Sequence, residues 1–153
     1  MINLFKNFHP NLDGKSILVT GGTGSFGQRF IKKIISKYKP KRLVIFSRDE
    51  LKQYDMSKEI RNHDFVRFFL GDVRDVDRLK MAFKDVDYVI HAAALKQVES
   101  SEYNPYECIQ TNIIGSQNVI SASLENNVKK VIFISTDKAT NPIRQELQNE
   151  NSI

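Results

Sequence analysis

The sequence has few of the residues on which secreted and metal-binding proteins depend. Cys108 is the only cysteine of 153 residues, which excludes an internal disulfide and a cysteine-ligated metal cluster and fits a reducing compartment. His9 and His63 are isolated, and no second histidine lies at ligand spacing from His91, which we interpret as a structural residue at a strand end. We therefore expect no metal.

Long apolar runs are also missing. No stretch of about 18 apolar residues occurs, and no charged and then apolar leader precedes Lys6. We expect a cytoplasmic protein that makes no contact with a membrane. The net charge of +5 does not indicate nucleic-acid binding, because the densest basic stretch, 32–42, has no interleaved aromatic stripe and is typical of a solvated helix face.

Short apolar runs alternate with longer amphipathic ones along the chain. The expected strands are 17–19, 43–46, 65–70, 88–90 and 131–134, and the expected helices are 25–38, 49–61, 75–83 and 105–126. Near-continuous apolar strands separated by helices predict a parallel sheet covered on both faces. The fold class is therefore α/β, a doubly wound Rossmann fold of order 3-2-1-4-5 that is truncated after its fifth strand.

The last expected helix has clear boundary signals. Asn104 is placed as its N-cap and Pro105 at its first position, and Glu107 completes a pair that resembles a capping box. The apolar spacing predicts an inward stripe made of Tyr106, Ile109, Ile113, Ile120 and Leu124.

Residues 20–27 join the first strand to the first helix through evenly spaced glycines. Gly21 permits the tight turn, Gly24 lets backbone N–H groups approach a pyrophosphate, and Gly27 lets the helix pack closely on the sheet. A flexible loop is the alternative, but strand, turn and helix agree on a dinucleotide site. Its expected cofactor-binding residues are Gly21, Thr23, Gly24, Ser25, Phe26 and Gly27.

The residues after the second strand indicate which dinucleotide binds. Arg48 supplies a planar cation suited to a ribose 2′-phosphate, whereas Asp49 keeps an NAD-type contact to the 2′-OH open. Alternatively, Ser47 and Glu50 form a capping box and Arg48 pairs with a surface acid. We place Ser47 and Arg48 in the site and favour NADP over NAD.

Three further strand ends supply candidate site residues. Asp72 is expected to accept from the adenine amino group while Val73 packs on the ring, although Asp72 could instead cap the next helix. Ala92, Ala93 and Ala94 allow a flat cofactor to lie against the backbone, and Lys96 points toward the substrate or into solvent. After the fifth strand, 135–138 offers a hydroxyl, a carboxylate and an amine for acid, base and orienting roles, or a plain polar turn.

Together these motifs resemble the extended short-chain dehydrogenase/reductase superfamily, and within it the soluble UDP-N-acetylglucosamine 4,6-dehydratases of polysaccharide and flagellar-glycan biosynthesis. The resemblance is carried by residues 20–27, 47–53, 71–75, 91–96, 104–105, 111–115 and 135–139. It implies a tightly held NADP that takes a hydride from C4 of a UDP-sugar and returns it at C6 after water is lost between C5 and C6.

The resemblance also implies roles for single residues. Asp137 would be the acid that helps the C6 hydroxyl leave, Lys138 the base at C5, and Thr136 a hydrogen-bond partner of the substrate near O4. Asn112 would support the cofactor site from the long helix, and Lys96 is placed with the substrate. Because we expect no spanning helices, the chain resembles the soluble, inverting branch of the family. The resemblance leaves a homo-oligomer possible for the intact family members.

The sequence departs from the family pattern near its end. Glu146 and Glu150 stand where the resemblance places a tyrosine and a lysine. We divide the chain into an incomplete NAD(P)-binding Rossmann domain, 1–143, and a divergent polar tail, 144–153, with the substrate domain absent. The predicted function is that of an N-terminal dehydratase fragment, inactive alone; the alternative is a non-catalytic NADP-binding module or remnant.

Overall fold

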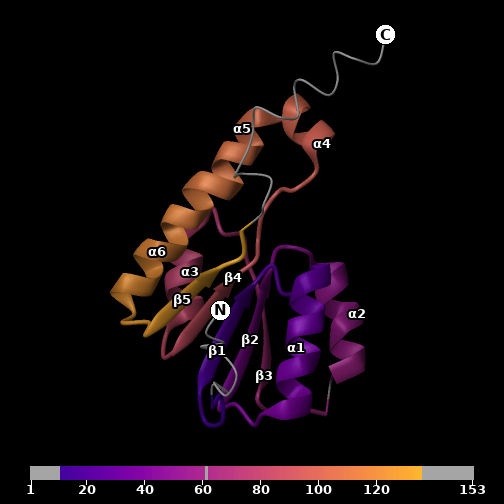
Figure 1. The fold of residues 1–153 in the computed structure, drawn as a ribbon, viewed down its shortest axis with the longest axis vertical. Helices are drawn as coiled ribbons and strands as arrows, with labels where there is room; N and C mark the ends of the chain where they lie inside the picture. The colour runs from indigo at the N-terminus through magenta and orange to yellow at the C-terminus, as the bar shows by residue number, and fades with distance from the viewer. Residues whose placement is uncertain (1–10, 61, 136–153) are drawn as a thin grey trace, which may run out of the picture.

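The computed structural model describes residues 11–60 and 62–135 and shows one parallel sheet with helices on both faces (Figure 1). The strands are β1 (Ser16–Thr20), β2 (Arg42–Ser47), β3 (Val66–Leu70), β4 (Tyr88–His91) and β5 (Lys130–Phe133). They lie in the order β3-β2-β1-β4-β5, and all their pairings are parallel. The predicted Rossmann-type order 3-2-1-4-5 is therefore confirmed.

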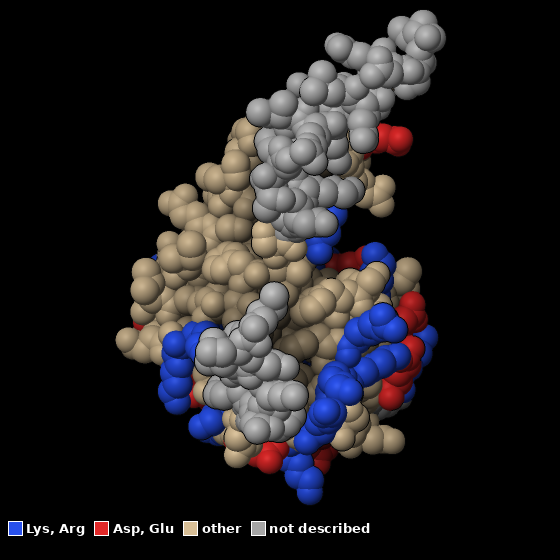
Figure 2. Space-filling view, in the orientation of Figure 1, with Lys and Arg blue, Asp and Glu red and all other residues tan. Residues whose placement is uncertain are grey.

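One face of the sheet is covered by α1 (Ser25–Lys37) and α2 (Glu50–Ile60). Alternate strand residues such as Ile17, Val19 and Ile45 point into this layer, where they pack against Ile31 and Ile34 of α1. The outer side of α1 is solvated as expected, since Lys32, Lys33 and Lys37 are exposed. Figure 2 shows the blue lysine and arginine side chains in a band on this side of the molecule.

The other face is covered by α3 (Val76–Phe83) and α6 (Gly115–Glu125), which also pack against each other. The intervening strand residues, among them Leu18, Val44 and Val89, meet Leu79 and Val119 in a second core. Because both faces of the central strands are buried, successive residues such as Leu18 and Val19 are both apolar, and apolar residues do not alternate with polar ones. All five carboxyl ends open on the same edge of the sheet.

The helical segment after β4 differs from the prediction. A short helix that the sequence did not indicate, α4 (Val98–Tyr103), precedes α5 (Pro105–Cys108), and a π-helical segment, η1 (Ile109–Ile114), connects α5 to α6. Asn104 precedes α5 but its side chain caps no N–H; it donates to Ser100 O instead. Glu107 binds Arg74 rather than completing a capping box.

The predicted inward stripe of this helix is wrong. Its five members, Tyr106, Ile109, Ile113, Ile120 and Leu124, are all exposed. The buried side consists of smaller residues, Thr111, Gly115, Val119, Ala122 and Ser123. A Cβ built on Gly115 would lie 2.7 Å from Cγ2 of Val73, so the small residues permit a close approach that the larger stripe would prevent.

Within the part of the chain that the structure describes, no helix has the length and apolarity needed to cross a membrane.

Candidate dinucleotide site

The turn between β1 and α1 approaches the end of β4 very closely. Gly21 has φ +64°, and a Cβ built on it would lie 2.8 Å from the backbone nitrogen of Ala93. At Gly27 a Cβ would lie 2.5 Å from the carbonyl oxygen of Gly22, so the first turn of α1 packs directly on the turn. Gly24 is the N-cap of α1 and no side chain caps the helix there, which leaves its first N–H groups free to bind an anion.

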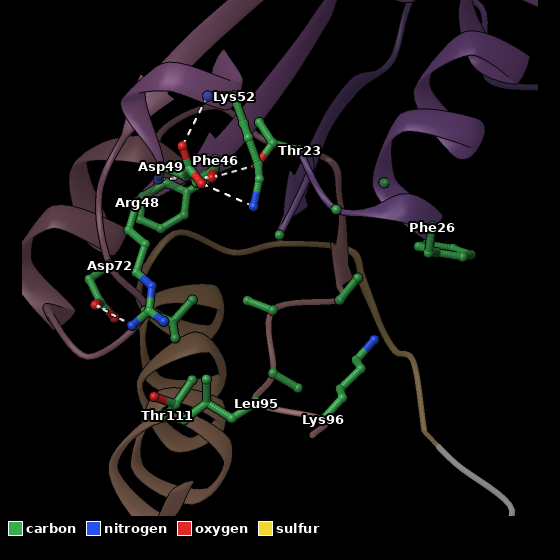
Figure 3. A pocket seen from close by; sticks show the side chains of 18 of the residues that line it. Thr23, Phe26, Phe46, Arg48, Asp49, Lys52, Asp72, Leu95, Lys96 and Thr111 are labelled. Carbon is green, nitrogen blue, oxygen red and sulfur yellow. Dashed lines mark hydrogen bonds and ion pairs between the residues drawn. The ribbon is translucent and has the colours of Figure 1, made fainter. Parts of the chain in front are cut away.

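A cavity of about 560 Å³ lies at the carboxyl ends of the strands, beside this turn (Figure 3). It is lined by every predicted cofactor residue except Asn112, and also by Lys96, which was assigned to the substrate. The lining residues that the prediction left out of the site are Phe46, Asp49, Lys52, Gly71, Leu95 and Thr111. The structure thus gathers five separate chain segments around one hollow, although their roles toward a cofactor stay predictions.

Thr23 and Ser47 connect the glycine turn to the end of β2. Their hydroxyl oxygens lie 2.7 Å apart and both residues are buried. Gln53 of α2 secures the same strand end, because its Nε2 donates to Ser47 O at 2.9 Å and to Phe69 O at 3.1 Å. The phosphate-facing turn and the strand end that carries Arg48 are therefore held as one unit.

Asp72 lies between two arginines at the mouth of the cavity. Arg74 donates to its carboxylate from Nε at 3.1 Å and from Nη2 at 2.9 Å, and Arg48 Nη1 lies 3.5 Å away. Partial burial would raise the pKa of Asp72, but the hydrogen bonds and charge of Arg74, with the charge of Arg48, outweigh burial and lower the pKa. Arg74 is itself tied to Glu107 of α5 at 2.6 Å, so the carboxylate is fixed from outside the cavity.

Lys52 is a second cation at the Arg48 end of the cavity (Figure 3). Its ammonium lies 3.1 Å from Asp49, and its backbone N–H donates to the same carboxylate at 2.9 Å. These two hydrogen bonds lower the pKa of Asp49, which stays ionised. The sequence signal was present, since Lys52 stands one helical turn after Asp49 at the start of a helix.

Thr111 also lines the cavity, and the sequence predicted no role for it. Its side chain is 5% exposed, and its hydroxyl has no hydrogen-bond partner among the described residues. It lies in η1, and π-helical segments often occur at functional sites. A buried hydroxyl without a partner is unfavourable, so the position is suited to a polar group of a ligand. No sequence rule marked it, because a regular helix was expected there.

A second cavity, of about 880 Å³, shares residues 93–96 with the first. Asn112, Lys96 and Ser135 line it, and Asn112 binds Leu95 with both ends of its amide, accepting from Leu95 N at 2.8 Å and donating to Leu95 O at 3.0 Å. Asn112 therefore holds residues 92–96, which we call the wall of the site. The predicted catalytic residues Thr136, Asp137 and Lys138 lie outside the described residues, directly after Ser135.

No group of three histidine, cysteine, aspartate or glutamate side chains able to hold a metal occurs within residues 11–60 and 62–135. His91 is buried, its Nδ1 lies 2.7 Å from Thr20 Oγ1, and it also lines the second cavity.

A family model described as polysaccharide biosynthesis protein matches residues 17–145. The chain belongs to this family. A UDP-N-acetylglucosamine 4,6-dehydratase (inverting) of Campylobacter jejuni is 60% identical over 131 residues, which cover 86% of this chain and 39% of that protein. A UDP-glucose 4-epimerase of Rickettsia bellii is 53% identical over 133 residues, which cover 84% of this chain and 38% of that protein.

The likeness extends to solved structures. UDP-glucose-4-epimerase from Stenotrophomonas maltophila, with bound NAD and formylated UDP-arabinopyranose, superposes with a TM-score of 0.70 at 25% identity, covering 81% of this chain and 38% of that one. This polysaccharide biosynthesis family member is thus similar to the N-terminal part of nucleotide-sugar dehydratases and epimerases, and it spans about two fifths of the length of the curated relatives it matches.

Proposed function

We propose that the chain is the NADP-binding part of a UDP-N-acetylglucosamine 4,6-dehydratase. The observation that carries the proposal is the cavity between the uncapped N-terminus of α1 and the Arg48–Lys52 cation pair, in a chain 60% identical to such an enzyme. The NAD in the Stenotrophomonas epimerase supports a nicotinamide dinucleotide as the class of cofactor.

The described residues fit a dinucleotide along the whole cavity. A pyrophosphate is suited to the free N–H groups of α1, where Gly21 and Gly24 leave no side chain in its way. A flat ring system is suited to the part of the wall formed by Ala92, Ala93 and Ala94. The unpartnered Thr111 hydroxyl offers a hydrogen bond at the side lined by Val73 and Leu95.

The cation pair supports NADP over NAD. A ribose 2′-phosphate carries close to two negative charges, and Arg48 and Lys52 both line the end of the cavity next to Ser47. By itself the Asp49 carboxylate would repel that phosphate, but the ammonium and the backbone N–H of Lys52 bind this carboxylate and offset its charge. Arg48, Lys52 and Arg74 are matched in charge by Asp49, Asp72 and Glu107, but Arg48 makes the longest of these ion pairs, at 3.5 Å, and its partner Asp72 is held more closely by Arg74. Arg48 is therefore the cation most available to a phosphate.

The bound dinucleotide would supply the hydride acceptor, and the chain's own residues would bind and move protons. Lys96 lines both cavities, so we place the UDP-sugar in the second cavity, next to the proposed dinucleotide site. Ser135 lines the second cavity and Thr136, Asp137 and Lys138 follow it in sequence, which supports their proposed roles as orienting group, acid and base.

A non-catalytic NADP-binding module is the second candidate. It is favoured by Glu146 and Glu150, which replace the tyrosine and lysine of the family pattern. The tyrosine would take the O4 proton during oxidation at C4, and the lysine would lower the pKa of that tyrosine. We therefore expect the 153-residue chain to bind NADP and to form no 4-keto sugar by itself.

A chimera tests the dehydratase proposal. Residues 1–143 are joined to the remaining C-terminal part of the Campylobacter enzyme, and the chimera is incubated with NADP and UDP-N-acetylglucosamine while 4-keto sugar is followed by mass spectrometry. We expect product from the chimera and none from its Lys138→Ala variant. A folded chimera that binds NADP without forming product would favour the binding module, and one that binds neither cofactor would refute both candidates.

A further inference from the structure

Three buried or half-buried side chains form a continuous hydrogen-bonded chain beneath the wall at residues 92–96. Thr20 Oγ1 lies 2.7 Å from His91 Nδ1, and His91 Nε2 lies 3.3 Å from Ser116 Oγ. Ser116 Oγ in turn donates to the carbonyl oxygen of Asn112 at 2.6 Å. The chain therefore runs from the end of β1, through the last residue of β4, into the helix formed by η1 and α6.

The protons of this chain can be assigned from its ends. Thr20 Oγ1 accepts the backbone N–H groups of Ala92 at 3.2 Å and Ala93 at 3.3 Å, so its own proton is available for His91 Nδ1. At the other end, the Ser116 proton is used on the Asn112 carbonyl, so Ser116 Oγ accepts from His91 Nε2. Every proton points from β1 toward the helix, and His91 is the neutral tautomer protonated at Nε2.

Both ends of the chain hold the same segment. Thr20 fixes the N–H groups of Ala92 and Ala93 at the beginning of the wall, and Asn112 binds both backbone groups of Leu95 near its end. The wall is also closely packed against Gly21, because a Cβ built on Gly21 would lie 2.8 Å from Ala93 N. Residues 93–96 of this segment line both cavities.

The surroundings of His91 keep its ring neutral and immobile. The ring is packed edge-on against Phe133 with centroids 5.0 Å apart, and His91 is buried although it lines the second cavity. Burial lowers its pKa to about 4, so the ring carries no charge at neutral pH. A neutral imidazole is required here, because a second ring proton at Nδ1 would face the proton of Thr20.

We propose that Thr20, His91 and Ser116 act as a directional hydrogen-bonded chain that fixes the wall at residues 92–96, with His91 as a positioning residue for the ligand that lies against it. The identity of that ligand as a nicotinamide dinucleotide rests on the proposed function. The arrangement of protons rests on the distances alone.

The first test reads the tautomer directly in the 153-residue chain. Proton-detected nitrogen NMR of the imidazole groups, with His91→Gln to identify the signal, should show His91 protonated at Nε2 and not at Nδ1 at pH 7. Thr20→Ser keeps a hydroxyl and should keep this pattern, whereas Thr20→Val removes the donor and should shift the Nδ1 resonance. A ring protonated at Nδ1 in the unmodified chain would overturn the proposal.

The second test separates positioning from simple stabilisation. NADP affinity is measured by calorimetry at a temperature where thermal unfolding shows each protein folded. Thr20→Val should weaken binding by about tenfold through the displaced wall, whereas Thr20→Ser should stay within about twofold. Thr20 does not line either cavity, so direct contact with the ligand does not explain such a loss.

The outcomes are distinguishable. A lower unfolding temperature for Thr20→Val with unchanged NADP affinity would show a merely structural role and overturn the positioning part. If the unmodified chain binds neither NADP nor NAD, the proposed function fails and the positioning part fails with it, while the NMR result still decides whether the directional chain exists.

Discussion

Arg48 stands 3.5 Å from Asp72, so the cation that faces the cavity is already shared with a carboxylate from the end of the next strand. Asp72 in turn is more closely bound by Arg74, at 2.9 Å. Arg48 is about half exposed, and its remaining N–H groups stay available to a ligand. Arg48 can therefore bind a second anionic group while it stays paired with Asp72.

Replacing Arg48 with Gln should weaken NADP binding more than NAD binding. The lost charged hydrogen bonds to the 2′-phosphate are worth about 1–3 kcal/mol, and NAD has no group there to lose. Calorimetric titration of both cofactors measures the effect, with Arg67→Gln as the control, since Arg67 lies on β3 and does not line the cavity. Equal affinities of the unmodified chain for NAD and NADP would contradict the prediction.

Replacing Arg74 with Gln should also reduce the preference for NADP, although Arg74 does not line the cavity. Without Arg74, Asp72 has Arg48 as its remaining ion-pair partner and competes with the ligand for it. The pairs are partly exposed, so we expect a loss of about 0.5–1 kcal/mol in NADP affinity. Glu107→Gln removes the other partner of Arg74 and leaves the Arg74–Asp72 bonds in place, so it should change affinity less. A larger loss in Glu107→Gln would show that Asp72 is not the intermediary.

Gly21 and Gly14 form a matched pair for testing close approach at the turn. Both have positive φ, +64° and +68°, but a Cβ at Gly14 meets open space while one at Gly21 meets the backbone of Ala92 and Ala93. Gly14→Ala should therefore cost only the backbone strain of about 1–2 kcal/mol. Gly21→Ala should cost more and also abolish cofactor binding, as urea unfolding and calorimetry would show. Equal destabilisation by the two substitutions would refute the close contact.

The stability of the protein should depend on the ionisation of His91 in mildly acidic solution. Burial lowers its pKa from 6.5 to about 4, so the unfolded chain takes up this proton first as the pH falls. The free energy of unfolding then decreases below pH 6.5 and stops responding to this group below about pH 4, a total of about 3 kcal/mol. Urea unfolding of the unmodified chain and of His91→Gln isolates the contribution. Parallel pH curves for the two proteins would contradict it.

The strands and the residues at their ends could be predicted from the sequence because the strands are marked by short apolar runs. Apolar runs such as Leu43–Phe46 have no polar side and must be buried on both faces, which specifies a parallel sheet. Once the sheet is parallel, its carboxyl ends share an edge, so residues as distant as Thr23, Ser47 and Ala93 were correctly placed together.

The features that the sequence concealed depend on the packing of whole elements. Apolar spacing placed Ile113 and Leu124 inside, but the sheet and α3 select the side that allows the closest approach, and Gly115 and Ala122 provide it. Lys52 belongs to the cavity because α2 begins directly at its edge, and the position of Thr111 depends on a π-helical turn. The pairing of Lys52 with Asp49 follows from local spacing, but the location of Lys52 and Thr111 beside the cavity depends on how α2 and η1 pack.

The π-helical segment also determines the phase of the long helix. An α-helix rotates by about 100° per residue, so a turn that holds an additional residue rotates everything beyond it relative to everything before it. In η1 the N–H of Gly115 reaches back five residues to the carbonyl of Gln110. Thr111 and Asn112 of η1 line the two cavities, while Val119 and Ala122, farther along the same helix, fill the core. A single helix thus carries a ligand-facing sequence in its wide turn and a packing sequence in its α-helical part.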